Sequence, residues 1–453
     1  MAVSIILRVG DTNTYDVSLT SSGVAVLDYP MSSPDLNQSV LQNLGDGNTL
    51  GVPSFSNVTE SLDLHISDST AALVATKVQA IERLLDLARQ GSLGYLDDRL
   101  YLRVQFDNDS LVWRSQILAA KLELPEGTNQ IWRKYVKATL IITRRFYWET
   151  EAMQAVEVSS ASTAATTSYA TVYNSKLSSG NTNLFAIAAN QVTGSLPAPA
   201  KIYIKNISGA TRYFRAAHIG NYVFNDPANI QPIFNGATAD ASDTTPGATE
   251  QDVYSWELDG GLVDDFAGQM GRFVVVWSNL PAVDNLIRAA VSLGSPFPSL
   301  ALALGEQMLN TEGHYVQDLG ALPIPPGGYT AGMGAALYAA IKSLTATGSD
   351  TLGVDWLQIF PTGVGRYRVI KGIYSMSIST NNEVIDDGPN NACWEVGTGG
   401  VLLPTLRPLH TPIYLWPGRA QRFRMIISSG AFTMETAQPW GVKVEYRPRR
   451  LSF

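Results

Sequence analysis

The chain has a single cysteine, Cys393, among 453 residues. One thiol cannot form a disulfide within the chain, so stability must come from packing or from association of subunits. We interpret Cys393 as a small buried hydrophobe. The four histidines are widely spread, and no His or Cys pair has the spacing of a zinc site. The sequence therefore predicts no bound metal and no cofactor.

Charged residues are also scarce, at 16 % of the chain, and the formal net charge is −8. An acidic chain lacks the basic stripe of proteins that coat nucleic acid, so we expect no specific nucleic acid as a partner. A large surface with few charges is typical of a subunit that hides surface against its neighbours, but also of a secreted β-sandwich. Hydrophobic residues make up 45 %, which is enough for the cores of two or three domains.

Long hydrophobic runs are absent as well. No window approaches the roughly 18 uninterrupted apolar residues that a membrane-spanning helix needs. The N-terminus has a short apolar stretch without a basic region before it and turns polar after Arg8, so we interpret it as a first strand and not as a signal peptide. We expect a chain that is made in the cytoplasm and has no membrane partner.

The sequence has no catalytic motif of the common kinds, neither a Gly-x-Ser-x-Gly elbow nor a phosphate-binding P-loop. Glu257 and Asp259 would share one face of a strand, which leaves a glycan depolymerase as one alternative function. An exposed strand edge explains the same pair more simply. Asp264-Asp265 and Asp386-Asp387 offer oxygen ligands for Ca²⁺, but solvated acidic turns are the simpler interpretation. We predict no catalytic residue and no enzyme.

Periodicity predicts an α+β module in residues 1–150. An apolar stripe at helical spacing runs through Val74, Val78, Ile81, Leu85 and Ala88. Alternating strands follow from Leu100 to Phe106 and from Tyr135 to Trp148. A lone helix of this length would be marginal in water, so the stripe must pack on the sheet. We expect a curved antiparallel sheet with one helix on it.

The rest of the chain reads as β structure, so the fold class is mainly β with one principal helix. Residues 151–180 are rich in Ser, Ala and Thr and are predicted to be a linker. Residues 181–392 hold many short strands between Gly and Pro turns, as in a β-sandwich of the jelly-roll or galactose-binding type. Residues 393–453 form a closing β segment that either completes the sandwich, which we favour, or returns to the first module.

Residues 60–150 resemble the N-terminal module of distal-tail proteins, a family of phage baseplate subunits. The resemblance covers about a fifth of the chain and is carried by Ser61-Leu62-Asp63-Leu64-His65-Ile66, by the helical Ile81-Glu82-Arg83-Leu84-Leu85-Asp86-Leu87-Ala88, by Leu100-Tyr101-Leu102, by Arg114-Ser115-Gln116-Ile117-Leu118 and by Arg145-Phe146-Tyr147-Trp148-Glu149. It implies a structural subunit of the virion, located in the tail tip or baseplate.

The same resemblance implies a cyclic homo-oligomer whose partners are other phage tail proteins of the tube, hub and fibres. A closed ring is physically reasonable, because neighbours in a ring pair the exposed edges of open sheets. Basic residues that match an acidic neighbour are the candidate interface. They are Arg133, Lys134, Lys137, Arg144, Arg145, Arg447, Arg449 and Arg450.

A glycan-binding receptor module of the tail is the other alternative, with a host glycan as partner. Trp and Tyr rings suit sugars because they are flat and amphipathic. The candidate glycan contacts are Trp256, Trp277, Trp356 and Trp394.

Overall fold

The computed structural model describes most of the chain and divides it into two compact units. The described residues are 3–10, 15–37, 40–42, 48–50, 54–92, 99–107, 109–125, 134–175, 182–222, 233–235, 250–258, 269–280, 285–293, 300–310, 315–324, 337–344, 352–429 and 439–452. Unit 1 comprises Met1–Gln154, Gly194–Leu196 and Arg447–Phe453, and unit 2 comprises Ala155–Thr193 and Pro197–Tyr446. The chain is mostly β and, in its described part, has one α-helix, so the predicted fold class is confirmed.

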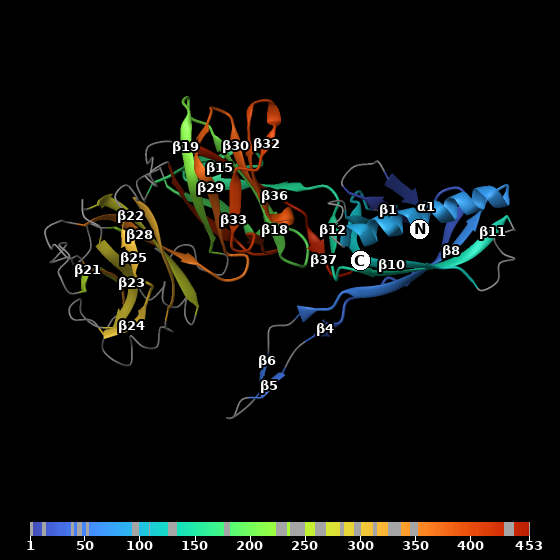
Figure 1. The fold of residues 1–453 in the computed structure, drawn as a ribbon, viewed down its shortest axis with the longest axis horizontal. Coiled ribbons are helices and arrows are strands. Elements are labelled where there is room, and N and C mark those ends of the chain that lie inside the picture. Colours follow the sequence, from blue (N-terminus) through green and yellow to red (C-terminus); the bar gives the residue numbers. More distant parts are fainter. Residues whose placement is uncertain are drawn as a thin grey trace. The chain divides into compact units, whose positions relative to one another are not determined.

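Unit 1 is a nine-stranded antiparallel sheet with helix α1 (Ala71–Ser92) packed on it (Figure 1). Seven strands follow the order β2-β1-β9-β10-β11-β8-β3, and β12 joins β10 to β37. The strands are β1 (Val3–Val9), β2 (Asp16–Ser18), β3 (Val24–Asp28), β8 (Val58–Ser67), β9 (Leu100–Phe106), β10 (Trp113–Glu123), β11 (Tyr135–Arg144), β12 (Trp148–Thr150) and β37 (Arg449–Arg450). The pairing of β10 with β11 contains a bulge, where the register shifts between Ile117 and Ala119.

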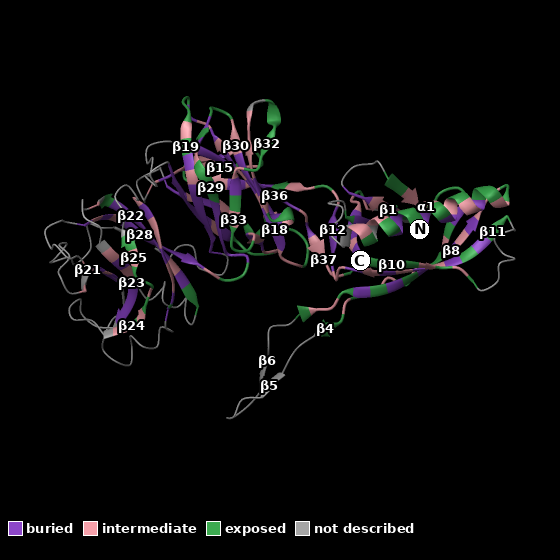
Figure 2. Ribbon diagram, in the orientation of Figure 1, coloured by how far each residue is buried: buried purple, intermediate pink, exposed green. Residues whose placement is uncertain are grey.

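The predicted apolar stripe of the helix is buried against this sheet. Val74, Val78, Ile81 and Leu85 join one core with inward residues of the strands, such as Leu64. The side chain of Ala88, the last residue of the predicted stripe, is not among those that the structure describes. The other face of α1 is exposed or half-buried, as Figure 2 shows. The 3.6-residue period therefore placed the helix correctly, because only one face had a partner.

An arm leaves the sheet of unit 1 between β3 and β8. It begins with the paired strands β4 (Leu36–Asn37) and β7 (Ser54–Phe55) and continues into the pair β5 (Val40–Gln42) and β6 (Asn48–Leu50). Figure 1 shows these strands leading away from the sheet. At the root of the arm, Phe55 stacks on Phe146 with ring centroids 5.6 Å apart.

Unit 2 contains a sandwich of an eight-stranded and a seven-stranded sheet. The first follows β13-β36-β18-β30-β31-β32, with β16 beside β36 and β34 beside β18, and the second follows β15-β14-β17-β35-β19-β29-β33. Its strands are β13 (Gln154–Val156), β14 (Val158–Ser160), β15 (Thr163–Thr166), β16 (Ala170–Tyr173), β17 (Leu184–Ile187), β18 (Ala198–Asn206), β19 (Arg212–Asn221), β29 (Tyr367–Ile378), β30 (Glu383–Asp387), β31 (Ala392–Val396), β32 (Leu402–Leu403), β33 (Leu406–Leu409), β34 (Tyr414–Leu415), β35 (Gln421–Ser428) and β36 (Pro439–Tyr446).

A second pair of sheets is inserted between β19 and β29, which are themselves paired. One sheet follows β20-β28-β22-β26, and the other follows β21-β27-β23-β24 with β25 beside β23. The strands are β20 (Ile233–Asn235), β21 (Gln251–Glu257), β22 (Met270–Asn279), β23 (Asn285–Leu293), β24 (Leu300–Leu304), β25 (Met308–Asn310), β26 (Val316–Pro323), β27 (Leu337–Leu344) and β28 (Gly353–Pro361). The insertion has a hydrophobic core, which Tyr367, Val369 and Ile426 of the first sandwich also join. The interior of the first sandwich forms a second core.

The structure corrects three predicted boundaries. The predicted linker, residues 151–180, includes four strands that pair within the first sandwich, because its small residues fit a pleated surface as well as a loop. The single sandwich predicted for 181–392 is two, one inserted into the other. The closing segment is divided, since β35 and β36 complete the first sandwich whereas Arg447–Phe453 belongs to unit 1.

A buried histidine makes the stability of unit 2 depend on pH. The His218 Nδ1 lies 2.7 Å from the Tyr367 hydroxyl, and burial lowers the pKa of His218 from 6.5 to about 4. Asp318 opposes this shift, whereas Arg272, His410 and Lys371 add to it.

Acid is therefore expected to destabilise this region. Between pH 6.5 and 4 the unfolded chain binds a proton at His218 that the folded chain does not, so stability falls as the pH falls. The expected loss is on the order of 3 kcal/mol. Urea unfolding at pH 7 and pH 4.5, with a His218→Gln variant as control, measures it. An equal pH slope in both proteins would contradict the assignment to His218.

Candidate assembly site

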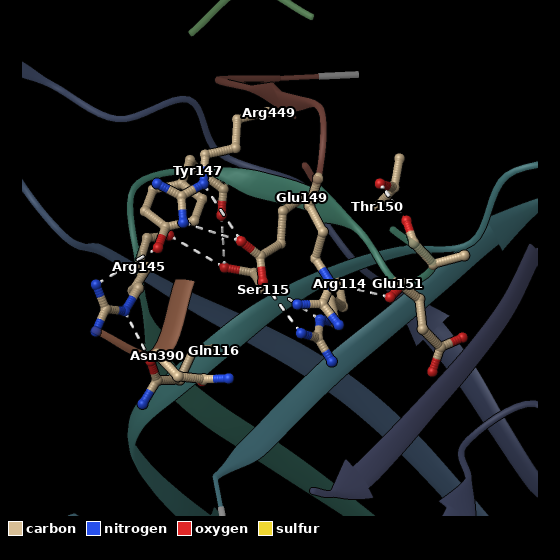
Figure 3. Close-up of polar contacts among 12 residues, drawn as sticks. Arg114, Ser115, Gln116, Arg145, Tyr147, Glu149, Thr150, Glu151, Asn390 and Arg449 are labelled. Atoms are coloured by element: carbon tan, nitrogen blue, oxygen red, sulfur yellow. Dashed lines mark hydrogen bonds and ion pairs between the residues drawn. The ribbon is translucent and has the colours of Figure 1, made fainter. Parts of the chain in front are cut away.

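The C-terminal strand β37 is bound into unit 1 by a cluster of arginines and glutamates. Glu149 of β12 accepts a contact from Arg114 at 3.3 Å and from Arg449 at 3.0 Å, with one carboxylate oxygen for each. Figure 3 shows Glu149 between the two guanidinium groups. Backbone pairing of Glu149 with Arg449 holds the same strands together. One carboxylate therefore joins the middle of the sheet to the end of the chain.

Aromatic rings surround the same cluster. The Arg449 guanidinium lies 4.0 Å from the centre of the Tyr147 ring, and Arg450 lies 3.6 Å from that of Trp113. Cations over aromatic faces are attracted by the ring quadrupole, more strongly where water is partly excluded. Ser115 adds a hydrogen bond from its hydroxyl to the Tyr147 carbonyl, 2.9 Å. The strand β37 is thus fixed by side chains as well as by its two ladder residues.

A loop of the chain closes over β37. Ser195 N–H donates to the Arg449 carbonyl at 2.8 Å. Gly194 has φ +103°, and a Cβ added there would lie 2.6 Å from the Arg449 carbonyl oxygen. Only glycine adopts this conformation without strain and admits so close an approach of two backbones.

A second carboxylate, Glu151, collects two arginines near the β2 edge of the sheet. Arg8 of β1 contacts it at 2.5 Å, and Arg103 of β9 contacts its other oxygen. Arg8 also pairs with Asp16 of β2 at 2.5 Å. Both Arg8 and Arg103 are largely covered, so these contacts hold the outer strands in register.

The root of the arm is held by a buried ion pair between β8 and β11. Arg144 Nη2 lies 2.5 Å from Glu60 Oε1, and both side chains are 0 % exposed. Glu60 also accepts from the Tyr29 hydroxyl at 2.7 Å and from Ser32 N–H at 2.9 Å. Burial next to Glu60 raises the pKa of the Tyr29 hydroxyl, which therefore keeps its proton as a donor. The pair fixes the segment through which the chain enters the arm.

The basic residues predicted as an interface mostly serve unit 1 itself. Arg144 is buried with Glu60, and Arg145 donates to Gln116 at 2.7 Å. Arg447 donates to the Glu151 carbonyl at 3.0 Å, and β37 provides Arg449 and Arg450. Only Lys134 and Lys137 are exposed, and Arg133 lies outside the described residues. Acceptors of the same chain, and not an acidic neighbour, are thus the partners of the five arginines from Arg144 onwards.

Sequence reasoning missed the acids that collect these arginines. Glu60 lies in β8, Glu149 in β12 and Glu151 just after β12, all far along the chain from the arginines that they bind. The basic run Arg447-Pro448-Arg449-Arg450 was the available signal, because clustered arginines commonly pair with acids. Nothing in the local pattern says that the partners are in β12.

The predicted glycan contacts fall in different environments. Trp256, Trp277 and Trp356 are 4 %, 2 % and 0 % exposed and belong to the core of the inserted sandwich. Buried indoles do not line a groove, so these three are corrected to core residues. Trp394 is half-buried on β31 of the first sandwich.

The candidate acidic residues also lie in different environments. Glu257 is exposed at the end of β21, and Asp259 and Asp264-Asp265 lie outside the described residues. Asp386 is buried in β30 and paired with Arg368 at 2.8 Å, so Asp386-Asp387 is not the solvated turn that was expected. Cys393 is buried, as predicted.

Two searches for sites gave negative results within the described part of the chain. No group of three or more His, Cys, Asp or Glu side chains is placed to hold a metal ion there. No helix among the same residues is long and apolar enough to cross a membrane.

Comparisons with known proteins give structural neighbours only. No family model matches the chain, and no curated protein matches its sequence. The chain is similar to the Dit (gp 19.1) protein of phage SPP1, described as a paradigm of the hub adsorption apparatus of phages that infect Gram-positive bacteria, with 9 % identity, a TM-score of 0.38 and 99 % of each chain covered.

It is also similar to the phage P2 baseplate in its activated conformation with Ca, with 8 % identity, a TM-score of 0.31 and coverage of 99 % of this chain and 98 % of that one. The same baseplate with Sr gives a TM-score of 0.29 at 8 % identity and the same coverage. These neighbours are phage hub and baseplate proteins, the class that residues 60–150 resemble.

Proposed function

We propose that this chain is a structural, non-catalytic subunit of a phage tail tip or baseplate, located in the virion, and that unit 1 assembles with copies of itself into a closed ring. The pattern of residues 60–150 supports the tail-tip role, as described above. The sheet of unit 1 supports the ring. Its strand order ends in β2 on one side and β3 on the other.

Open edges are the first support for assembly. An unpaired edge strand presents backbone donors and acceptors to any other chain, and proteins normally cover it. When one edge of a subunit meets the other edge of its neighbour, a ring results if the rotation closes. Leu27 of β3 is 57 % exposed, which adds apolar surface along that edge.

The arm carries the proposal furthest. It is held at its root by Glu60 and Arg144, but it extends away from the core of unit 1 (Figure 1). Leu36 in its first strand is 55 % exposed. An apolar hairpin that leaves its own core is stabilised when it packs on another molecule, and a neighbouring copy in a ring is always within reach. Other tail proteins of the tube, hub and fibres would then contact the ring and not the single chain.

The ring is tested by light scattering after size exclusion and by negative-stain electron microscopy of the purified chain. We expect one closed oligomer of defined mass. In a matched variant, residues 38–53 are replaced by Asn-Gly, which closes the hairpin between Asn37 and Ser54 with a two-residue turn. This variant is expected to keep its circular dichroism spectrum and to lose the ring.

A Tyr374→Ser variant is the control, since Tyr374 is exposed in unit 2 and outside the proposed contact. It should form the same oligomer as the parent chain. A protein that stays monomeric at every concentration and is missing from tail particles would defeat the proposal. A ring that survives the loss of the arm would leave the sheet edges as the contact and remove the arm from it.

A further inference from the structure

The outer face of the eight-stranded sheet in unit 2 carries an ordered array of side chains that the assembly role does not use. Lys443, Tyr203, Ile385 and Trp394 stand directly opposite one another on β36, β18, β30 and β31. Residues paired in this way share one face of a sheet. The alternate residues, such as Ile204 and Val442, point into the core. The row around Trp394 therefore lies on the face away from the core.

Charges flank this row in equal numbers. Residues two positions away along a strand lie on the same face. They include the cations Lys201 and Lys205 and the anions Glu383, Asp387 and Glu445. Lys443, in the row itself, is the third cation. Lys443 pairs with Glu445 at 2.6 Å, and Lys201 lies 3.8 Å from Asp387. The face is dense in hydrogen-bond donors and acceptors but has no excess of either charge.

The two aromatic rings of the row differ in what they touch. The Tyr203 ring has Lys201 and Lys443 ammonium groups 5.5 Å and 5.0 Å from its centre, and its hydroxyl donates to Glu445 at 2.7 Å. Trp394 is half-buried. Within the part of the chain that the structure describes, the Trp394 side chain has no hydrogen bond, ring contact or cation contact. The indole, without such a contact, thus stands at the end of a row that is flanked by paired charges.

We propose that this face binds a neutral oligosaccharide, with Trp394 as the stacking platform and Lys201 and Glu445 as its hydrogen-bonding partners. A pyranose offers a C–H face to an indole ring and a rim of hydroxyls that both donate and accept. Paired charges of opposite sign suit such a rim, because each ion supplies one half of the hydrogen bonding. Balanced charge gives no advantage to a polyanion such as a sulphated or sialylated chain.

A protein partner fits this face less well. Protein interfaces are depleted of Lys, Glu and Asp at their centres, whereas this face has six such residues beside the rings of Tyr169, Tyr203 and Trp394. Ion pairs buried under a protein would lose hydration without a partner for their remaining donors and acceptors. Sugar hydroxyls and the water around them replace that hydration.

The test uses the full chain on an array of neutral oligosaccharides built from hexoses, deoxyhexoses and N-acetylhexosamines, with sialylated and sulphated glycans beside them. We expect binding to at least one neutral glycan, followed by calorimetric titration with that glycan. Trp394→Ala should weaken binding at least about tenfold, Trp394→Phe should restore most of it, and Lys201→Met should weaken it with the stacking surface intact.

Tyr213→Ala is the matched control, since Tyr213 is 54 % exposed on β19 of the other sheet. It should bind like the parent chain. Melting curves of all variants exclude misfolding as the cause. The proposal would be overturned if the array retained no neutral glycan, or if Trp394→Ala bound as tightly as the parent chain. It would also be overturned if the chain preferred sulphated glycans and this binding weakened with added salt. A monomeric protein would carry the same face. The glycan experiment can therefore succeed or fail independently of the ring experiment.

Discussion

Replacing Arg144 by Met is expected to lower the free energy of unfolding of unit 1 by about 3 to 5 kcal/mol. The change leaves the Glu60 carboxylate buried without its cation, and both side chains are 0 % exposed in the parent protein. Desolvation of an unpaired charge costs far more than the pair itself contributes. Arg144 also lies 4.6 Å from the centre of the Trp148 ring, so packing is lost as well.

The effect is measured by hydrogen exchange resolved to peptides of β8 and β11, together with urea unfolding. Local exchange is needed because a chain with two units need not unfold in one step. The Glu60→Gln, Arg144→Met double variant should recover part of the loss, since it removes the orphaned charge. Arg89→Met is the matched control at an exposed pair with Asp86, and it should change little. Protection of β8 and β11 equal to the parent's in Arg144→Met would refute the role of the pair.

The same variant is expected to release the root of the arm. Arg144 donates to the Ser32 carbonyl at 2.9 Å, and Glu60 holds Ser32 N–H and the Tyr29 hydroxyl. Without the pair, the segment from Tyr29 to Ser32 loses its fixed direction. If the arm joins neighbouring copies, ring formation should therefore weaken in Arg144→Met before unit 1 itself unfolds.

Replacing Arg368 by Met is expected to have an effect of similar size on unit 2, about 3 to 5 kcal/mol. Arg368 binds Asp386 at 2.8 Å, and both side chains are 0 % exposed. It also donates to Asn391 Oδ1 and to the His410 carbonyl, each at 2.8 Å. One guanidinium thus joins β29 to β30 and to the end of β33. Its loss removes a donor from Asn391 Oδ1 and from the His410 carbonyl, and leaves Asp386 with the Cys393 thiol in place of a cation.

The pH dependence identifies the orphaned carboxylate. Burial already raises the pKa of Asp386 above its usual value of 3.8, and removal of Arg368 raises it further. An acid whose pKa is higher in the folded than in the unfolded chain binds its proton more tightly when folded. Stability of Arg368→Met should therefore increase as the pH falls towards 4, relative to the parent chain.

Urea unfolding at several pH values measures this trend, and an Asp386→Asn, Arg368→Met double variant should abolish it while recovering part of the stability. His218 works in the opposite direction, because its lowered pKa makes the parent chain lose stability in acid. A His218→Gln background separates the two slopes. If Arg368→Met and the parent chain had the same urea midpoint of unfolding at pH 7, the buried pair would contribute little to stability.

Local periodicity was sufficient for the elements that bury one face. The helix over Ala71–Ser92 and the strands β9 and β11 appear where the apolar residues recur at 3.6-residue and two-residue spacing. Such patterns are local, and burial of one face is all they require. For the same reason, the composition of residues 151–180 misled, because small residues with few charges are found in linkers and in short sandwich strands alike.

The partners of the strands were decided by the tertiary structure. Pairing of β12 with β37 joins Glu149 to Arg449 across 300 positions of the chain, and no local period records such a choice. The insertion between β19 and β29 is equally invisible, since each of its strands looks like a strand of the surrounding sandwich. Chain entropy opposes these long-range contacts, and only the summed burial of the completed cores offsets it.

The roles of charged and aromatic side chains divide in the same way. From the sequence alone came the chain's acidic balance, its mainly β character, its principal helix and the family that residues 60–150 resemble. The tertiary structure decided that Arg144 and Arg449 are internal, that Trp356 is core and that Trp394 faces outwards. The physical reason is that residue type sets what a side chain can bind, whereas burial and the nearest opposite charge set what it does bind, and both of these depend on the whole fold.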